Sequence, residues 1–367
     1  MSLKLPLREL RRRPTRFLVA TVVLAFLSTL LLFLGGLLDG LYLGSTGAIR
    51  AQDADVIVYS STARDSFLRS RITADVRSEV DAVDGVDAVG GLGFVLLGAD
   101  VPGEADPADV AIAGYELAPK GVPEVSSLYD GQGVADRRLE DQGVGVGDTL
   151  LIGPAKTEVT VVGWVEDTAY LQQGTIWVNL ATWRQVQNAN RPDAAVADDV
   201  VQALVVRGSG DLAAAIDTAT GGATSTLTVE EAVLALPGVE QQNSTFNQII
   251  YSTLVVVLAV VGLFFSLLTL ERLGLYGVLK AVGASSGRLF AGVVLQAVVV
   301  TIVAFVAGSA LAMAAAAALP SGVPLQLEPS RFVFTFTALL VASVLGSAIS
   351  LRKVLHVDPA AAIGTSS

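Results

Sequence analysis

The sequence of 367 residues has no cysteine and only one histidine, His356. Without cysteine the chain can form no disulfide, no zinc–thiolate centre and no thiol nucleophile. A single imidazole excludes a multi-histidine metal site, and a Ser-His-Asp triad would have to be built on His356. The glycine-rich loop with lysine that binds nucleotide phosphates is also absent, so the chain alone is not expected to hydrolyse ATP. We therefore expect no catalytic residues and no metal site, and interpret the protein as a non-enzyme.

Charged residues are scarce as well. They make up 16% of the chain, against about 25% in a typical soluble domain, whereas 52% of the residues are hydrophobic. The net charge of −11 argues against nucleic acid as a partner, because binding phosphates requires concentrated Lys and Arg. Four apolar runs carry no charge and are long enough for the roughly 20 residues that cross a bilayer as a helix. These runs are 17–38, 249–270, 289–319 and 332–351.

The distribution of basic residues predicts the orientation of these helices. Residues 1–16 carry a net charge of +5 and residues 271–288 carry +2, while Arg352 and Lys353 follow the last run. The positive-inside rule places these segments and both termini in the cytosol, as in a multi-pass protein of the cell (inner, cytoplasmic) membrane. The first run is too long for a cleaved signal peptide. The predicted order is a cytosolic segment (1–16), a first span (17–44), an extracytoplasmic domain (45–247), a second span (248–270), a cytosolic loop (271–288), a third span (289–319), a short outer loop (320–331), a fourth span (332–351) and a cytosolic tail (352–367).

The domain inserted between the first two spans is predicted to be acidic and of mixed α/β type. It holds 12 Lys and Arg against 30 Asp and Glu, a net charge of −18. Adjacent carboxylates at 198–199 and 230–231 lack the spacing of a calcium loop, and we interpret them as solvated surface. Short β-branched runs alternate with segments of helical spacing. We expect strands at 55–60, 86–98, 109–115, 149–152, 158–165, 175–179 and 200–206, helices at 73–83, 211–220 and 228–236, and helix followed by turn at 133–147.

The cytosolic loop has a distinctive pattern. From Leu270 to Ser285 it reads LERLGLYGVLKAVGAS, a short amphipathic helix in which apolar residues at helical spacing alternate with charges. This stretch resembles the coupling segment "R-R-x-E-I-G-[IVL]-[LM]-[KR]-A-[LI]-G-A-[ST]" of FtsX/MacB-type ABC transporter permeases. Two positions differ from that pattern. Glu271 lies three rather than two residues before Gly274, and Tyr276-Gly277 replaces an aliphatic pair.

Three other segments extend the resemblance over nearly the whole chain. Residues 357–363 resemble the family's tail "x-D-P-[AV]-x-A-[IL]". Residues 134–165 resemble the outer-domain pattern "L-G-[LV]-x-[VI]-G-D-x-[IL] … [FV]-x-V-V-G". Residues 3–15 resemble the elbow helix that lies on the membrane surface before the first span, and residues 53–72 are most similar to the short permeases of the DevC and HrtB kind, which export glycolipid and haem.

This resemblance implies a homodimeric permease that works with a separate cytosolic ABC ATPase, which would bind the ATP and Mg²⁺, while this chain binds no cofactor. The implied function is export of a hydrophobic substrate from the membrane, with haem, lipid and drugs as candidates. In the elbow helix, Arg11, Arg12 and Arg13 would contact the ATPase or anionic lipid headgroups, or would serve only as a topology signal. The residues implied in coupling to the ATPase are Glu271, Arg272, Lys280, Gly283, Ala284 and Ser285.

A substrate entering from the membrane would meet the first two spans and the base of the outer domain. The candidate residues on this path are Gly35, Gly36, Asp39, Tyr42, Phe246 and Tyr251. The two glycines permit close helix approach. The phenols of Tyr42, Tyr59 and Tyr251 could ligate haem, although aromatic residues at membrane interfaces also serve packing.

Two other functions are compatible with the same sequence. In the first, ATP-driven closure moves the outer domain and activates a cell-wall hydrolase without transport, which is FtsX-like mechanotransmission. In the second, the chain is a membrane-anchored sensor or scaffold without an ATPase. The product of the neighbouring gene would separate the sensor or scaffold, which works without an ATPase, from the exporter and the regulator.

Overall fold

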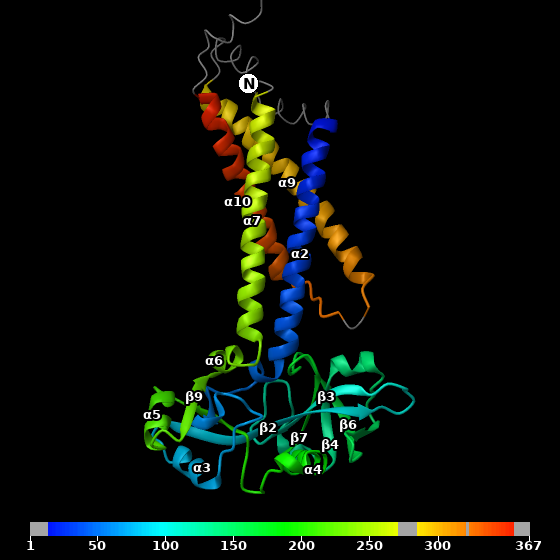
Figure 1. The fold of residues 1–367 in the computed structure, drawn as a ribbon, viewed down its shortest axis with the longest axis vertical. Coiled ribbons are helices and arrows are strands. Elements are labelled where there is room, and N and C mark those ends of the chain that lie inside the picture. Colours follow the sequence, from blue (N-terminus) through cyan, green and yellow to red (C-terminus); the bar gives the residue numbers. More distant parts are fainter. Residues whose placement is uncertain (1–13, 271–284, 321–322, 356–367) are drawn as a thin grey trace, which may run out of the picture. The chain divides into compact units, whose positions relative to one another are not determined.

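The computed structural model describes residues 14–270, 285–320 and 323–355. They form two compact units (Figure 1). The helical unit holds the residues up to Gly40 and those from Ser244 on, and the α/β domain holds Leu41–Asn243. The predicted architecture, four apolar helices with a mixed α/β domain inserted between the first and second, is confirmed.

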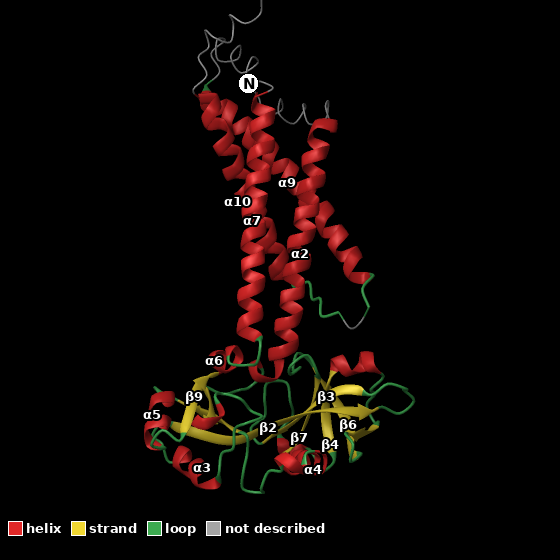
Figure 2. Ribbon diagram, in the orientation of Figure 1, coloured by secondary structure: helices red, strands yellow, loops and turns green. Residues whose placement is uncertain are grey.

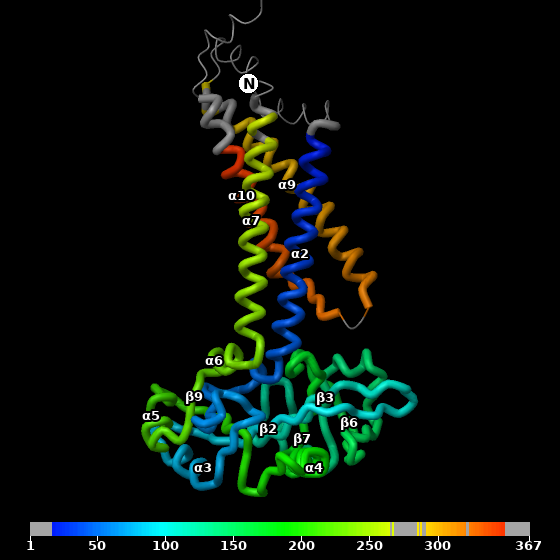
Figure 3. The backbone as a smooth tube through the Cα atoms, in the orientation of Figure 1, coloured from blue at the N-terminus to red at the C-terminus, as the bar shows by residue number. Residues whose placement is uncertain are grey.

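Four long helices build the helical unit. They are α2 (Pro14–Arg50), α7 (Val239–Leu270), α9 (Ser286–Ala317) and α10 (Pro329–Leu355). Each contains a stretch long and apolar enough to cross a membrane. Both α2 and α7 are longer than the apolar runs in them. The last residues of α2 (41–50) and the first residues of α7 (239–243) belong to the α/β domain. The tube in Figure 3 follows the chain from α2 through the α/β domain and back along α7.

Small residues bring these helices close together. Gly308 of α9 lies against α2, where an added β-carbon would be 2.6 Å from the carbonyl oxygen of Ala25, and Thr29 donates a hydrogen bond of 3.1 Å to the carbonyl of Gly308. Between α7 and α10, an added β-carbon on Gly346 would be 2.9 Å from the amide nitrogen of Gly262. Such contacts suit a membrane helix bundle, which is held by close packing and polar contacts rather than by the hydrophobic effect.

A single nine-stranded sheet forms the centre of the α/β domain (Figure 2). Its strand order is β3-β7-β4-β6-β5-β2-β8-β1-β9, and an additional pairing of β3 with β2 closes the first six strands into a ring. The strands are β1 (Val56–Ser60), β2 (Val86–Asp100), β3 (Ala108–Tyr115), β4 (Gln132–Asp136), β5 (Thr149–Ile152), β6 (Thr157–Val165), β7 (Gly174–Asn179), β8 (Ala203–Gly208) and β9 (Thr224–Thr228). The helices are α3 (Ala74–Asp81), α4 (Leu180–Asn190), α5 (Leu212–Ala219) and α6 (Val229–Leu234), with short 3₁₀ turns η1 (Ser61–Ala63), η2 (Val125–Ser127), η3 (Arg137–Gln142) and η4 (Pro192–Ala194).

Strands such as β1 and β3 are buried on both faces of the sheet, which explains why they are so apolar. Along β1, Val56 and Val58 belong to one hydrophobic cluster, while Ile57 and Tyr59 belong to the other. The alternation follows from the two-residue period of a strand. The second cluster contains a group of aromatic rings in mutual contact, which are Tyr59, Phe67, Phe94, Tyr115, Tyr170 and Trp177.

Glycines within the strands make room for a tryptophan. Trp183 of α4 is fully buried, and its side chain lies directly over Gly93 of β2 and Gly114 of β3. An added β-carbon on Gly114 would be 2.5 Å from the β-carbon of Trp183. A glycine inside a strand often marks such a close approach, so these residues position α4 on the ring rather than weaken the sheet.

The structure corrects one predicted element and adds two. The expected helix at 133–147 is wrong at its start, because this part is strand β4 followed by the 3₁₀ turn η3. Helix α4 and strand β9 were not predicted. The sequence of α4 is mostly polar and its buried face is short, and β9 is rich in threonine between glycines, so neither gave a clear apolar period.

Candidate functional site

The residues predicted to couple this chain to an ATPase lie largely outside the described residues. This holds for Glu271, Arg272, Lys280, Gly283 and Ala284, and for the elbow-helix residues Arg11, Arg12 and Arg13. Ser285 is described, is exposed, and occupies the N-cap position of α9 with extended backbone angles and no side-chain capping bond. The role of this set therefore stays a prediction.

The predicted substrate-path residues on α2 are enclosed by the chain itself. In the helical unit, segment 323–331, which ends in the first turn of α10, packs on the glycines of α2. An added β-carbon on Gly36 would be 2.8 Å from the side chain of Leu327, and one on Gly40 would clash with the carbonyl of Pro324. The amide of Gln326 donates a 3.0 Å hydrogen bond to the carbonyl of Gly36. The glycines thus make room for an extended segment, whereas the prediction was a close approach of helices.

An ion pair fastens the same segment to α2. The guanidinium of Arg331 donates two hydrogen bonds to the carboxylate of Asp39, from Nε at 2.9 Å and from Nη2 at 2.5 Å. Each side chain is only 18% exposed, and the guanidinium also lies 5.9 Å from the ring centre of Phe334. Two-point contact between Arg and a carboxylate fixes orientation as well as distance. Asp39 was predicted as a site residue, whereas Arg331 was not. In the sequence, Arg331 could have been noticed as a lone cation directly before the apolar run 332–351, predicted to lie on the same side of the membrane as Asp39.

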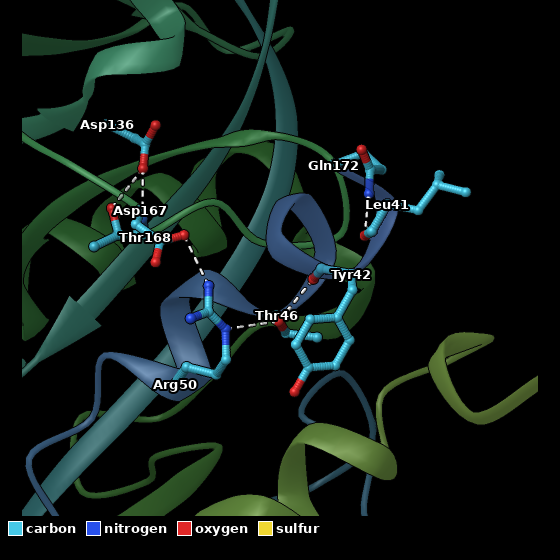
Figure 4. A network of polar contacts seen from close by, with 8 residues as sticks. All are labelled: Leu41, Tyr42, Thr46, Arg50, Asp136, Asp167, Thr168 and Gln172. Carbon is cyan, nitrogen blue, oxygen red and sulfur yellow. Dashed lines mark hydrogen bonds and ion pairs between the residues drawn. The ribbon is translucent and has the colours of Figure 1, made fainter. Parts of the chain in front are cut away.

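The last turns of α2 are held in the α/β domain by segment 167–172, which Figure 4 shows. Gln172 donates from its side-chain amide to the carbonyl of Leu41 at 2.6 Å and to the hydroxyl of Ser45 at 2.8 Å. The backbone amides of Leu171 and Gln172 donate to the carbonyls of Ser45 and Gly44. The segment therefore packs along one side of the helix, mainly through backbone and side-chain amide hydrogen bonds.

Charged and aromatic side chains extend this contact to the end of the helix (Figure 4). Arg50 forms a 2.7 Å ion pair with Asp167, donates a 3.0 Å hydrogen bond to the hydroxyl of Thr46, and lies 5.8 Å from the ring centre of Tyr42. The hydroxyl of Thr46 donates in turn to the carbonyl of Tyr42. Tyr42, a predicted site residue, is thus part of the α2 attachment, and it packs, partly buried, against the second hydrophobic cluster of the domain.

The backbone of segment 167–172 is in an uncommon conformation. Asp167, Leu171 and Gln172 have φ angles of 56°, 48° and 69°. A left-handed conformation costs a residue with a side chain roughly 1–2 kcal/mol, and it persists only where surrounding contacts enforce it. One such contact is the buried carboxylate of Asp136, which accepts hydrogen bonds from the amide and the hydroxyl of Thr168 at 2.7 and 2.8 Å. The segment is therefore a shaped, enforced surface for α2.

The other predicted path residues are placed separately on α7. Phe246 is partly buried against the hydrophobic cluster of the helical unit, and Tyr251 is 64% exposed. Tyr59, considered as a haem ligand, is fully buried within the aromatic cluster, where burial raises the pKa of its phenol well above the ordinary value. Its hydroxyl has no hydrogen-bond partner in the part of the chain that the structure describes. A phenol so placed cannot reach a ligand unless the domain core opens.

Among the described residues there is no group of three or more His, Cys, Asp or Glu that could hold a metal ion. The strongest pKa shifts belong to buried tyrosines of the aromatic cluster, and burial raises the pKa of Tyr115 to about 12. Tyr115 donates a 2.6 Å hydrogen bond to the carbonyl of Pro123, which is a structural contact. The contacts described above instead attach helix α2 to two separate segments, 323–331 and 167–172.

Comparison with known proteins shows what the C-terminal part of the chain is similar to. Residues 247–359 match the FtsX-like permease C-terminal domain. The chain therefore contains an FtsX-like permease domain. The matched region includes most of α7 and all of α9 and α10, and the predicted coupling segment 271–288 lies inside it.

Relatives of this permease differ in how much of it they cover. An ABC transporter permease of Mycobacterium tuberculosis is 25% identical over 375 residues, which is 98% of both chains. HrtB of Staphylococcus haemolyticus, named as a hemin transport system permease, is 28% identical over 125 residues. That match covers 34% of this chain and 36% of HrtB, so the chain spans about a third of the length of the first curated relatives it matches. Among solved structures, the periplasmic region of MacB from Actinobacillus actinomycetemcomitans covers 50% of this chain and 92% of that chain, with 12% identity and a TM-score of 0.35.

Proposed function

We propose that this permease is the membrane subunit of an exporter that moves a hydrophobic substrate out of the membrane, driven by a separate cytosolic ABC ATPase. The observation that carries the proposal is the FtsX-like match across α7, α9 and α10, joined to a full-length relative named as an ABC transporter permease. Because this chain lacks a nucleotide-binding loop, ATP and Mg²⁺ would be bound by the partner. A second copy of the chain would complete a homodimer.

Energy from the ATPase would enter through the cytosolic segments. Glu271, Arg272 and Lys280 would form ion pairs with the ATPase or at the membrane surface, and Gly283, Ala284 and Ser285 would allow close contact. Arg11, Arg12 and Arg13 would lie at anionic headgroups or on the ATPase. A helix moved as a rigid body needs only a few such anchored charges and a fitting shape.

Helix α2 is the element best suited to pass this motion on. Its residues 41–50 are held in the α/β domain by Gln172, by the ion pair of Arg50 and by backbone hydrogen bonds. A displacement of α2 along its axis would strain all of these contacts together, so the domain would follow the helix. The attachment also reaches the domain core, because Ala48 and Ile49 of α2 and Tyr170 of segment 167–172 are buried in the second hydrophobic cluster.

A substrate path along α2 would require segment 323–331 to move. Gly35 and Gly36 are covered by residues of this segment, and the charge of Asp39 is paired with Arg331. The predicted path residues Gly35, Gly36 and Asp39 would therefore become accessible only when the ion pair opens. Support for haem as a candidate substrate comes from HrtB relatives named for hemin transport, and lipid or a drug remains equally open.

The coupling can be tested with the ATPase encoded beside this gene. The two proteins would be purified as a complex, and ATP hydrolysis measured with wild-type permease, with Glu271→Lys and with Gly283→Asp. We expect both variants to lose most of the permease-dependent ATPase rate. Glu79→Lys is the matched control, because it makes the same charge reversal at an exposed residue of α3, outside the coupling segment and outside segment 323–331. Normal rates in both coupling variants would show that the assignment is wrong.

Transport and regulation are distinguished in cells. Deleting the gene should raise sensitivity to haem or to lipophilic compounds if the chain exports. Unchanged tolerance together with chained or undivided cells would instead favour the FtsX-like role, in which the α/β domain activates a cell-wall hydrolase. Failure of the purified chain to bind any ATPase would contradict both.

A further inference from the structure

The α/β domain has a recess that the proposed function does not use. It has a volume of about 150 Å³ and lies between the loop that follows η1, strand β2 and helix α4. Its lining includes Arg71 and Arg191 but no Asp or Glu. In a domain with 12 Lys and Arg against 30 Asp and Glu, a recess with cations and no carboxylate is unexpected.

One wall of the recess is a loop held on both sides of an exposed leucine. Phe67 is buried, with its ring centre 4.9 Å from that of Tyr59. The buried hydroxyl of Ser70 accepts a 2.9 Å hydrogen bond from the amide of Ser60. Between these anchors Leu68 is 51% exposed. Because the anchored loop keeps Leu68 half-exposed, its side chain contributes apolar surface to the recess without being buried itself.

The glutamine side chains on the floor and the opposite wall already have hydrogen-bond partners within the protein. The side-chain amide of Gln202 accepts from the amide of Phe94 at 2.7 Å and donates to its carbonyl at 3.0 Å. The amide of Gln187 donates to the carbonyl of Ala194 at 2.9 Å. Val95 supplies a buried apolar surface beside them. The lining is therefore rigid and mostly apolar, and further hydrogen bonds must come from the arginines.

Both arginines keep donors that the protein does not use fully. Arg71 is fixed by its Nη1, which donates to the carbonyls of Leu68 and Ser70 at 3.2 and 2.7 Å, while its Nη2 has one long contact of 3.5 Å to Ala194. In the part of the chain that the structure describes, Arg191 makes one ion pair, from Nε to the exposed Asp193 at 3.5 Å. A guanidinium has five N–H donors, and a carboxylate is the group that matches two of them at once.

From this arrangement we infer that the recess binds a carboxylate attached to a small apolar group, with Arg71 and Arg191 receiving the carboxylate and Leu68 and Val95 contacting the apolar part. A cavity of about 150 Å³ accommodates a group about the size of benzene. The apolar part is therefore comparable to one leucine or phenylalanine side chain, or to a chain of a few carbons. Such a group is found at the C-terminal residue of a polypeptide and in a free short-chain acid.

The test uses the full-length permease in lipid nanodiscs and three small probes. N-acetyl-leucine carries the carboxylate and a peptide amide, hexanoate carries the carboxylate alone, and N-acetyl-leucinamide has no carboxylate. Binding is measured by ligand-observed NMR. We expect N-acetyl-leucine to bind at least about tenfold more tightly than N-acetyl-leucinamide, because charge-assisted hydrogen bonds are lost in the amide. Equal binding of hexanoate indicates a free acid as the natural ligand, and preference for N-acetyl-leucine indicates a polypeptide C-terminus.

Variants of the two arginines complete the test. Arg71→Gln and Arg191→Gln should each weaken N-acetyl-leucine binding about tenfold or more. Arg69→Gln is the control, because it removes a cation from the same loop without altering the lining of the recess. Arg71→Gln could disturb the loop it fixes, whereas Arg191 contacts only an exposed aspartate, so Arg191→Gln decides the question by itself. Unchanged affinity in Arg191→Gln, or equal binding of acid and amide, would overturn the inference.

Discussion

Two Asp–Arg pairs on the same helix show how the helical unit and the α/β domain differ. In the helical unit, Asp39 and Arg331 make two hydrogen bonds and are each 18% exposed. In the α/β domain, Arg50 and Asp167 make one, with exposures of 28% and 57%. The chemistry is the same but the dielectric surroundings are not. A poorly solvated pair is costly to break, whereas an exposed pair contributes little.

The two units also differ in how they achieve close packing. The helices meet at Gly262, Gly308 and Gly346, while the α/β domain fills its interior with aromatic rings and places glycines under Trp183. Backbone strain is unequal as well. All non-glycine residues with positive φ in the described chain belong to the α/β domain. Long regular helices leave no place for such strain, whereas loops between short strands can hold it.

The largest effect should come from breaking the poorly exposed pair. Asp39→Asn leaves the Arg331 guanidinium without its counter-charge, and we expect a loss of about 3–5 kcal/mol of stability. Asp167→Asn makes the same change in the exposed pair and should cost no more than about 1 kcal/mol. Thermal unfolding of the purified permease in nanodiscs measures both. Similar losses in the two variants would show that the two environments are equivalent, against the comparison drawn above.

The next effect concerns the edge of the sheet in the α/β domain. Among the described strands, β9 pairs with β1 alone. Asp217 of α5 covers the other side of β9 by accepting hydrogen bonds from the hydroxyls of Thr224 and Thr226 and from the amide of Thr226. Asp217→Ala should cost about 1–3 kcal/mol, since several donors lose their acceptor. It should also promote aggregation, because an uncovered edge strand can pair with another chain.

Size-exclusion chromatography and thermal unfolding of Asp217→Ala test this directly. Asp198→Ala is the control, because Asp198 is an exposed carboxylate of the same domain. We expect the control to stay monodisperse with an unchanged unfolding midpoint. If Asp217→Ala behaves like the control, the carboxylate does not protect the edge.

The contrast between the units also explains what the sequence could predict. The four spans follow from hydropathy alone, because uncharged runs of this length have few other structures available. Strands such as β1 and β3 were predictable because both of their faces are buried and their residues are β-branched or small. The extension of α2 to Arg50 was not, since Gly44, Ser45 and Gly47 indicate a break in the helix. These residues are small because segment 167–172 lies against them, a tertiary contact that no local pattern contains.

The candidate site was predictable in part for a similar reason. Asp39 and Tyr42 could be selected because polar residues next to a membrane span are uncommon. Arg331, the partner of Asp39, lies 292 residues away along the chain, and Gln172 lies 131 residues from Leu41, the neighbour of Tyr42 that it contacts, so only the folded structure connects them. The arginines of the recess gave no signal either, because the local sequence does not distinguish an arginine in a recess from one on the solvated surface.

A smaller effect should come from relieving backbone strain. Arg64 is exposed, has no ion pair in the described chain and has φ and ψ angles of 51° and 53°. Arg64→Gly should stabilise the α/β domain by up to about 1 kcal/mol, since glycine adopts this conformation without steric cost. Arg69→Gly, in the same loop but without positive φ, should instead destabilise it by increasing the freedom of the unfolded chain. Urea unfolding of the two variants gives the comparison, and destabilisation by both would mean that the conformation at Arg64 carries no strain.

The smallest effect is a pH dependence at the surface of the α/β domain. Glu231 completes a capping box at the start of α6, and the backbone and side-chain hydrogen bonds from Thr228 lower the pKa of its carboxyl. The stabilisation is therefore present above the ordinary pKa of glutamate, and it is lost as the pH falls through the lowered value. Glu231→Gln can retain the capping geometry but does not titrate. The unfolding midpoints of wild type and Glu231→Gln should differ at about pH 7 and converge at about pH 3. A difference that persists unchanged at the lower pH would mean that the capping bond does not depend on the charge of the carboxylate.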